Sequence, residues 1–115
     1  PSHWQLLSQS SNFGLLVAYK AGLKALATRD GGWTSACFDL LVAFRNTRWD
    51  EVLPLHRHSD VGKIINRLNG RISCESKREA KNLLSDIERV LMRAELCSHA
   101  WVLACRQMAG IEGGN

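Results

Sequence analysis

The most regular hydrophobic pattern of the chain lies in its last third. From residue 71 to residue 109 there is no Gly or Pro, and apolar residues recur at three- and four-residue spacing: Ala80, Leu83, Ile87, Val90, Ala94, Cys97, Trp101, Ala104 and Met108. That spacing marks one face of an α-helix. Ser76 and Glu79 form a capping box at its start. The pattern therefore predicts a long C-terminal helix over residues 76–108.

This helix is too long for a domain of this size. At ~1.5 Å per residue it would span ~50 Å, whereas a globule of 115 residues measures only ~35 Å across. It must break, with Ser98-His99 as the candidate position, or reach beyond its own domain. The face opposite the apolar stripe carries Met92, Leu96 and Leu103 beside Arg78 and Arg89. A monomeric surface helix should be polar there, so we expect these five residues to contact a protein partner.

The rest of the chain also has helical patterns. Helices are expected over residues 13–28, 34–46 and 60–68, with a connection at 49–58 that includes at most one helical turn. Regular strand alternation is absent from the sequence. The expected fold class is all-α, a compact bundle of four or five helices with a long C-terminal helix. Residues 1–115 form a single helical domain in this interpretation, with frayed ends at 1–12 and 110–115.

The first two of these helices are unusually apolar. Eleven of the 16 residues at 13–28 and eight of the ten at 35–44 are apolar, which is too many for helices with one solvated face. Leaving ~400 Å² of apolar area uncovered would forgo ~10 kcal/mol, as much as the net stability of a whole domain. A homodimer or a tight hetero-partner would cover that surface. The alternative is internal coverage by the loops and by Trp4, Trp33 and Trp49.

Composition and charge narrow the function classes. The longest apolar run is six residues, at 100–105, whereas a bilayer span needs about 20, so no membrane association is expected. The formal net charge of +4 is concentrated in residues 57–81, which hold seven Lys or Arg against three Asp or Glu. This basic segment makes nucleic-acid binding the main competing function, and it could also dock an acidic partner. The candidate contact residues are Lys63, Arg67, Arg71, Lys77 and Lys81. The segment has no aromatic residue for base stacking.

Catalytic and metal-binding patterns are not found in the sequence. His56 and His58 have no CxxC or HxxxH pair beside them, and Cys97 and Cys105 lie roughly 12 Å apart along one helix. No nucleophile elbow or Gly-rich phosphate loop is present. Enzymatic activity, a metal and a cofactor are therefore not expected. Cys37, Cys97 and Cys105 lie among apolar residues, which favours free buried thiols in a reducing cytoplasm over disulfides.

In outline the chain resembles the small bacterial quorum-sensing anti-activators, which capture a LuxR-type transcription factor and prevent it from dimerising on DNA. The resemblance rests on the two apolar helices FGLLVAYKAGLKALA and SACFDLLVAF, the basic centre, and the long helical stretch KREAKNLLSDIERVLMRAELCSHAWVLACRQMA. It implies a cytoplasmic, cofactor-free regulator, dimeric alone or with its target, that covers the dimerisation or DNA-binding surface of a transcription regulator. The alternatives are a small DNA-binding regulator that uses residues 57–81, and a structural or secretion-chaperone role.

Overall fold

The fold is all-α, as the hydrophobic pattern predicts. The computed structural model describes residues 12–28, 32–54, 58–68 and 74–110, except the side chains of His58, Arg67 and Leu68. Within these ranges the chain forms six helices and no strand. They are α2 (Phe13–Ala27), α3 (Gly32–Asn46), α4 (Trp49–Val52), α5 (His58–Leu68), α6 (Lys77–Arg93) and α7 (His99–Met108).

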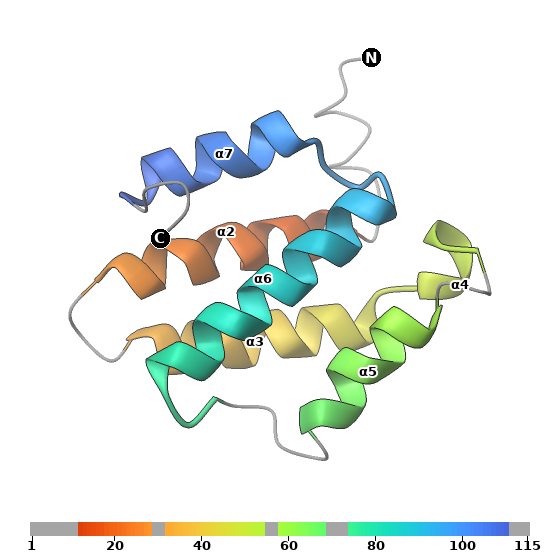
Figure 1. The fold of residues 1–115 in the computed structure, drawn as a ribbon, viewed down its shortest axis with the longest axis horizontal. Coiled ribbons are helices and arrows are strands. Elements are labelled where there is room, and N and C mark those ends of the chain that lie inside the picture. The colour runs from red at the N-terminus through yellow and green to blue at the C-terminus, as the bar shows by residue number, and fades with distance from the viewer. Residues whose placement is uncertain (1–11, 29–31, 55–57, 69–73, 111–115) are drawn as a thin grey trace.

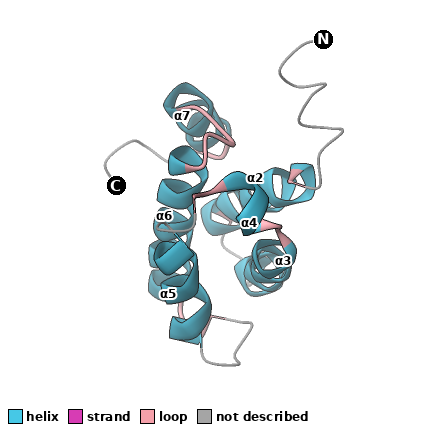
Figure 2. Cartoon of the chain, turned by 90° about the vertical axis from the view of Figure 1, so that its right-hand side faces the viewer, coloured by secondary structure: helices cyan, strands magenta, loops and turns pink. Residues whose placement is uncertain are grey.

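The helices form two layers with α7 packed across one end. Figure 1 shows α2 and α3 antiparallel to each other, with α6 crossing them diagonally and α7 lying above α2. Seen from the side, α5 and α6 make one column and α2 and α3 the other (Figure 2). Helices α5 and α6 thus lie on one side of the molecule and the apolar pair α2 and α3 on the other (Figure 2).

The core lies where these two layers meet. Tyr19 of α2, Phe44 of α3 and Ile87 of α6 are fully buried there, together with most of the leucines of these helices. The closest approach involves Gly22, where a Cβ atom would lie 3.2 Å from Cδ2 of Leu84. A glycine at this position therefore lets α2 pack tightly against α6.

Local signals fix several helix ends as expected. The hydroxyl of Ser76 accepts a hydrogen bond from the backbone N–H of Glu79 at 3.1 Å, and the Glu79 carboxylate accepts one from the N–H of Glu75 at 3.2 Å. These bonds satisfy amides that the first turn of α6 leaves unpaired. The short helix α4 is the single turn expected in the connection. Its Trp49 indole N–H donates to the carbonyl of Phe44 at 2.8 Å, which holds α4 against the end of α3.

The expected long C-terminal helix is divided in two. Helix α6 ends at Arg93, the chain turns through residues 94–98, and α7 begins at His99 with Ser98 as its N-cap. The turn requires Glu95 to adopt a φ of 57°, in the left-handed region. The helix thus breaks just before the candidate position Ser98-His99, with Ser98 as the last residue of the turn. It changes which residues of 92–108 face the core.

Candidate functional site

The break at residues 94–98 places the expected partner-binding residues in different environments. Leu96 is buried in the turn with an exposed fraction of 7%, and Met92 packs partly buried against the core. Leu103, on α7, is 41% exposed. The three residues do not share one helix face, because the helix predicted to continue to residue 108 ends at Arg93. Of the three, Leu103 is the one whose side chain is available to a partner.

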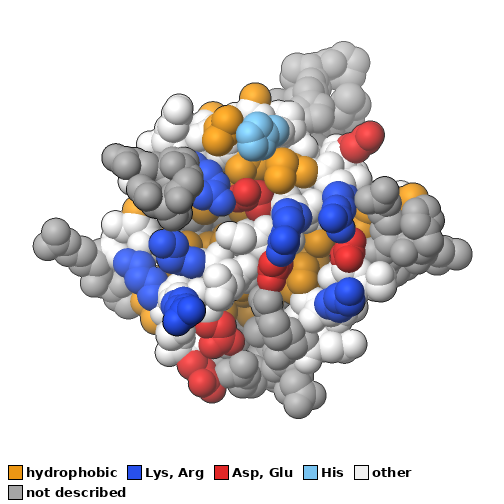
Figure 3. Space-filling model, in the orientation of Figure 1, with side chains coloured by type: hydrophobic (Ala, Val, Ile, Leu, Met, Phe, Trp, Pro, Cys, Tyr) orange, Lys and Arg blue, Asp and Glu red, His pale blue; other side chains and the backbone are white. Residues whose placement is uncertain are grey.

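Most of the expected basic contacts lie on the α5–α6 side. Lys63, Lys77, Arg78 and Lys81 are exposed there, and Figure 3 shows Lys and Arg side chains spread over this side. Lys77 donates to the carbonyl of Thr28 at 3.4 Å. Arg71 lies outside the described residues, and so does the side chain of Arg67. The positive charge is therefore spread along two helices.

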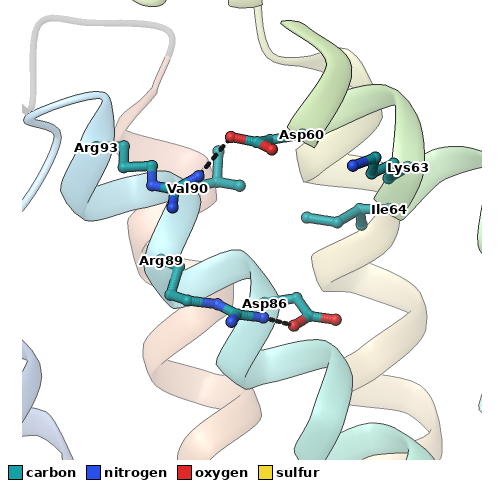
Figure 4. Close-up of a pocket in the computed structure, with 7 residues that line it drawn as sticks. All are labelled: Asp60, Lys63, Ile64, Asp86, Arg89, Val90 and Arg93. Atoms are coloured by element: carbon teal, nitrogen blue, oxygen red, sulfur yellow. Dashed lines mark hydrogen bonds and ion pairs between the residues drawn. The ribbon is translucent and has the colours of Figure 1, made fainter. Parts of the chain in front are cut away.

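A cleft of about 400 Å³ separates α5 from α6 on this side. Its lining residues come from both helices: Asp60, Lys63, Ile64, Asp86, Arg89, Val90 and Arg93 (Figure 4). Arg93 is 2.6 Å from the carboxylate of Asp60, and Arg89 pairs with Asp86. Two of its three cations are thus engaged by acidic neighbours, which lowers the attraction of this cleft for a polyanion such as DNA.

A second groove, of about 400 Å³, lies between α2 and α3. Most of its lining side chains are small: Gly14, Val17, Ala18, Ala21, Gly32, Ser35, Ala36 and Asp39. Small side chains on two neighbouring helices leave a shallow channel along the seam between them. The groove was not predicted from the sequence, since it depends on which small residues of the two helices come to lie opposite each other.

Exposed apolar side chains are concentrated on the helices that border this groove and on α7. The large hydrophobic residues with the greatest exposure in the described part of the chain are Val17, Phe38, Val42, Leu103 and Met108. Their exposed fractions run from 36% for Val42 to 72% for Met108. Val17, Phe38 and Val42 belong to the α2–α3 pair, and Leu103 and Met108 belong to α7. The α2–α3 pair thus combines a groove of small residues with three exposed apolar side chains.

A partly buried polar network links α2, α6 and α7. One carboxylate oxygen of Glu88 accepts hydrogen bonds from the Tyr19 hydroxyl at 2.5 Å and from the Arg106 Nη2 at 2.8 Å. The Glu88 and Arg106 side chains are only 14% and 19% exposed. Burial, together with the hydrogen bond to Glu88, holds the pKa of Tyr19 above its usual value. The network is the polar attachment of α7 to the rest of the fold.

All four cysteines are free and buried, as predicted for the three that lie in apolar surroundings. Burial is the main cause that raises the pKa of Cys37 and of Cys97 to about 12. These thiols stay protonated at neutral pH and are not activated as nucleophiles. The described residues contain no group of three or more His, Cys, Asp or Glu side chains that could hold a metal ion. His56, from the expected histidine pair, lies outside these residues.

No protein-family model, curated protein or solved structure matches this chain. Within the described ranges, none of the helices is both long and apolar enough to cross a membrane.

Proposed function

We propose that this protein is a non-enzymatic regulator that acts by binding another protein. Its target is a transcription regulator, as in the quorum-sensing anti-activators that the chain resembles, and it works by covering the target's dimerisation or DNA-binding surface. The observation that carries the proposal is the exposure of Val17, Phe38 and Val42 on α2 and α3, the two helices that form the small-residue groove. Burying a fully exposed side chain of this size is worth ~1.5–3 kcal/mol, and a partner gains the fraction that is still exposed here. A partner that covers several of them gains enough to bind tightly.

The docking surface in this proposal is the α2–α3 face, defined by the small-residue groove, which Val17 lines, and by the exposed Phe38 and Val42 of α3. Its occupant is an amphipathic helix of the target. Side chains as small as Ala18 and Ala21 allow a helix to lie close to the seam, at the ~8–10 Å axial spacing of packed helices. Grooves of this kind bind the apolar face of a partner helix through residues at i, i+3, i+4 and i+7.

The test compares a variant that fills the groove with one on the opposite side. Crosslinking in the native cell and mass spectrometry identify the target, and the purified pair is then titrated. Ala21→Trp should weaken binding at least ~10-fold, because the bulky ring occupies the space of the incoming helix. Lys81→Glu, on exposed α6, serves as the control and should bind within about twofold of the original chain. Full-strength binding by Ala21→Trp would refute this docking surface.

Inhibition is measured separately on the target's own DNA. Adding the original chain should release the target from its operator in a gel-shift assay, whereas Ala21→Trp should release it only at correspondingly higher concentration. If the two proteins bind but the operator complex is unaffected, the protein is a binding partner of another kind. Circular dichroism of Ala21→Trp confirms that the helices are intact.

DNA binding is the second candidate, and the exposure of Lys63, Lys77 and Lys81 on adjacent helices favours it. If these side chains contact phosphates, the logarithm of affinity should fall with the logarithm of salt concentration at a slope near −0.9 per phosphate neutralised. We expect only weak, non-specific binding, because Asp60 and Asp86 lie among the cations of the α5–α6 cleft. Nanomolar binding of a defined sequence at about 150 mM salt would make DNA binding the leading function.

A further inference from the structure

The turn at residues 94–98 conflicts with the sequence around it. Residues 71–109 contain no Gly or Pro, and their apolar stripe continues through the turn without a change of register. The chain nevertheless reverses there, with Glu95 at a φ of 57° and the N–H of Leu96 bonded to the carbonyl of Leu91 at 2.9 Å. This is the arrangement of a helix end that normally places Gly in the left-handed position. A glutamate in that position is strained, and a continuous helix would remove the strain.

Helix α7 is held to the rest of the fold by a small inner surface. Val102 and Cys105 are buried, the Trp101 ring lies 5.8 Å from the Tyr19 ring, and Arg106 pairs with Glu88. Its outer surface, with Leu103 and Met108, is exposed. These inner contacts depend on the presence of an α7 and not on which chain supplies it. The α7 of a second copy could make every one of them.

We propose that residues 94–98 are a hinge, and that two copies of this chain exchange their α7 helices after α6 and α7 join into one continuous helix. The ion pair makes the two states distinct. Glu88 and Arg106 are 2.8 Å apart here, whereas a continuous helix would separate their Cα atoms by ~27 Å. Within a chain whose α6 and α7 are continuous, Glu88 and Arg106 cannot pair with each other. Glu88 of each copy then pairs with Arg106 of the other.

Exchange keeps the native contacts of α7 and changes only the hinge. Both copies release the left-handed Glu95, and the Ala104 and Met108 positions come into line with the buried stripe of α6. The opposing changes are loss of the α7 N-cap, in which the Ser98 hydroxyl accepts from the Trp101 N–H at 3.1 Å, and of the present burial of Leu96 and Cys97 in the turn. A strained hinge combined with unchanged docking contacts is the condition under which domain swapping becomes a low-cost route to a dimer. This proposal does not depend on the proposed function.

Complementation between two charge-reversed chains tests the exchange directly. Glu88→Arg places two cations at the α7 attachment of one chain, and Arg106→Glu places two carboxylates at that of the other. Neither chain can form the pair within itself or with its own copies. In an exchanged heterodimer, however, one attachment holds the original pair and the other holds the reversed pair. Mixing the two variants should therefore give a heterodimer whose dissociation constant is at least ~100-fold below that of either homodimer, about tenfold for each restored pair.

The doubly reversed chain, Glu88→Arg with Arg106→Glu, is the control that shows whether the site accepts a reversed pair. Native mass spectrometry after prolonged co-incubation distinguishes the species by mass. A heterodimer no tighter than the homodimers, with a folded double variant, overturns the exchange. A dimer of the original chain that forms without complementation in the mixture also overturns it, since its interface then lies elsewhere.

A hinge variant tests the proposal without altering the ion pair. Glu95→Gly relieves the left-handed strain of the closed turn and weakens the continuous helix, so it should raise the dimer dissociation constant by at least ~25-fold, about fivefold per hinge. Glu95→Gln retains a side chain of the same length at the same φ and should stay within about twofold of the original chain. Sedimentation velocity over a concentration series measures both. Equal dimerisation by the Gly and Gln variants, or a strictly monomeric original chain, refutes the hinge.

Discussion

Removing the guanidinium of Arg106 is the perturbation whose energetic effect the structure defines best. Arg106→Met keeps the aliphatic stem of the side chain and deletes both hydrogen bonds to Glu88. The Glu88 carboxylate, 14% exposed, then keeps the hydrogen bond from the Tyr19 hydroxyl but has lost its counter-ion. An uncompensated charge in such a site is costly because it has lost both its partner and most of its water.

The expected magnitude follows from the burial of this pair. Breaking one partner of a fully buried pair costs about 3–5 kcal/mol, and the partial exposure of both side chains places this case near the lower end, at about 3 kcal/mol. Glu88→Gln, which leaves an acceptor for Tyr19, should cost about 2 kcal/mol because Arg106 then lacks its counter-ion. The double variant Glu88→Gln with Arg106→Met should cost no more than the worse single change. The sum of the two single changes exceeds the cost of the double variant by a coupling energy of at least about 2 kcal/mol.

Urea unfolding followed by circular dichroism at pH 7 measures these free energies, at a protein concentration where the chain is monomeric. Arg89→Met is the matched control. Arg89 also pairs with a carboxylate, that of Asp86, but its side chain is 64% exposed. An exposed pair contributes about 0–1 kcal/mol. If Arg106→Met and Arg89→Met destabilise the protein equally, burial does not govern the energetics of this pair and the reasoning fails.

Two further perturbations test the packing and the buried thiols. Gly62→Ala, where an added Cβ meets open space, should raise the free energy of unfolding by about 0.5–1 kcal/mol. Gly22→Val should lower the free energy of unfolding by more than about 1 kcal/mol, because it overpacks the α2–α6 contact. A stabilised Gly22→Val would show that this contact is loose. The pKa values of Cys37 and Cys97 are raised from 9.0 to about 12 in the folded chain, so the unfolded chain loses these protons at lower pH. The stability that these two thiols contribute is complete below pH 9. It should fall by about 1.4 kcal/mol per pH unit and per thiol as pH rises from 9 towards 12. Urea titrations at pH 8 to 11 should show a shallower decline for Cys37→Ser, and an unchanged slope would contradict the assignment.

Much of this fold could be predicted from the chain, because its helices have strong local signals. The spacing of apolar residues places the bounds of α2 and α3 within two residues of those observed. Pro54 marks the connection, and the capping box marks α6. These signals act within a few residues of one another, so they operate before any tertiary contact forms.

The end of α6 could not be placed in this way. Nothing local favours a turn at Glu95, and only the diameter of the domain required a break. The turn is stabilised by contacts far away in sequence, chiefly Trp101 with Tyr19 and Arg106 with Glu88. The break determines which side chains of residues 92–108 face the core. Leu96, which was expected at a partner interface, is therefore buried. The α2–α3 groove escaped prediction for the same reason, since it results from the pairing of two helices.

Exchange of α7 and docking of a partner would use different sides of α2. Helix α7 contacts α2 through Tyr19, whereas Ala21 lines the groove, and at 100° per residue these side chains point about 160° apart. An exchanged dimer therefore keeps two open grooves and should bind two target molecules, whereas a monomer binds one. Sedimentation of the complex should give a 2:2 assembly for the original chain and a 1:1 assembly for Glu95→Gly, with the affinity per groove unchanged. Loss of target binding in Glu95→Gly, with its helices intact, would instead show that the groove forms only in the dimer and that the two surfaces act as one.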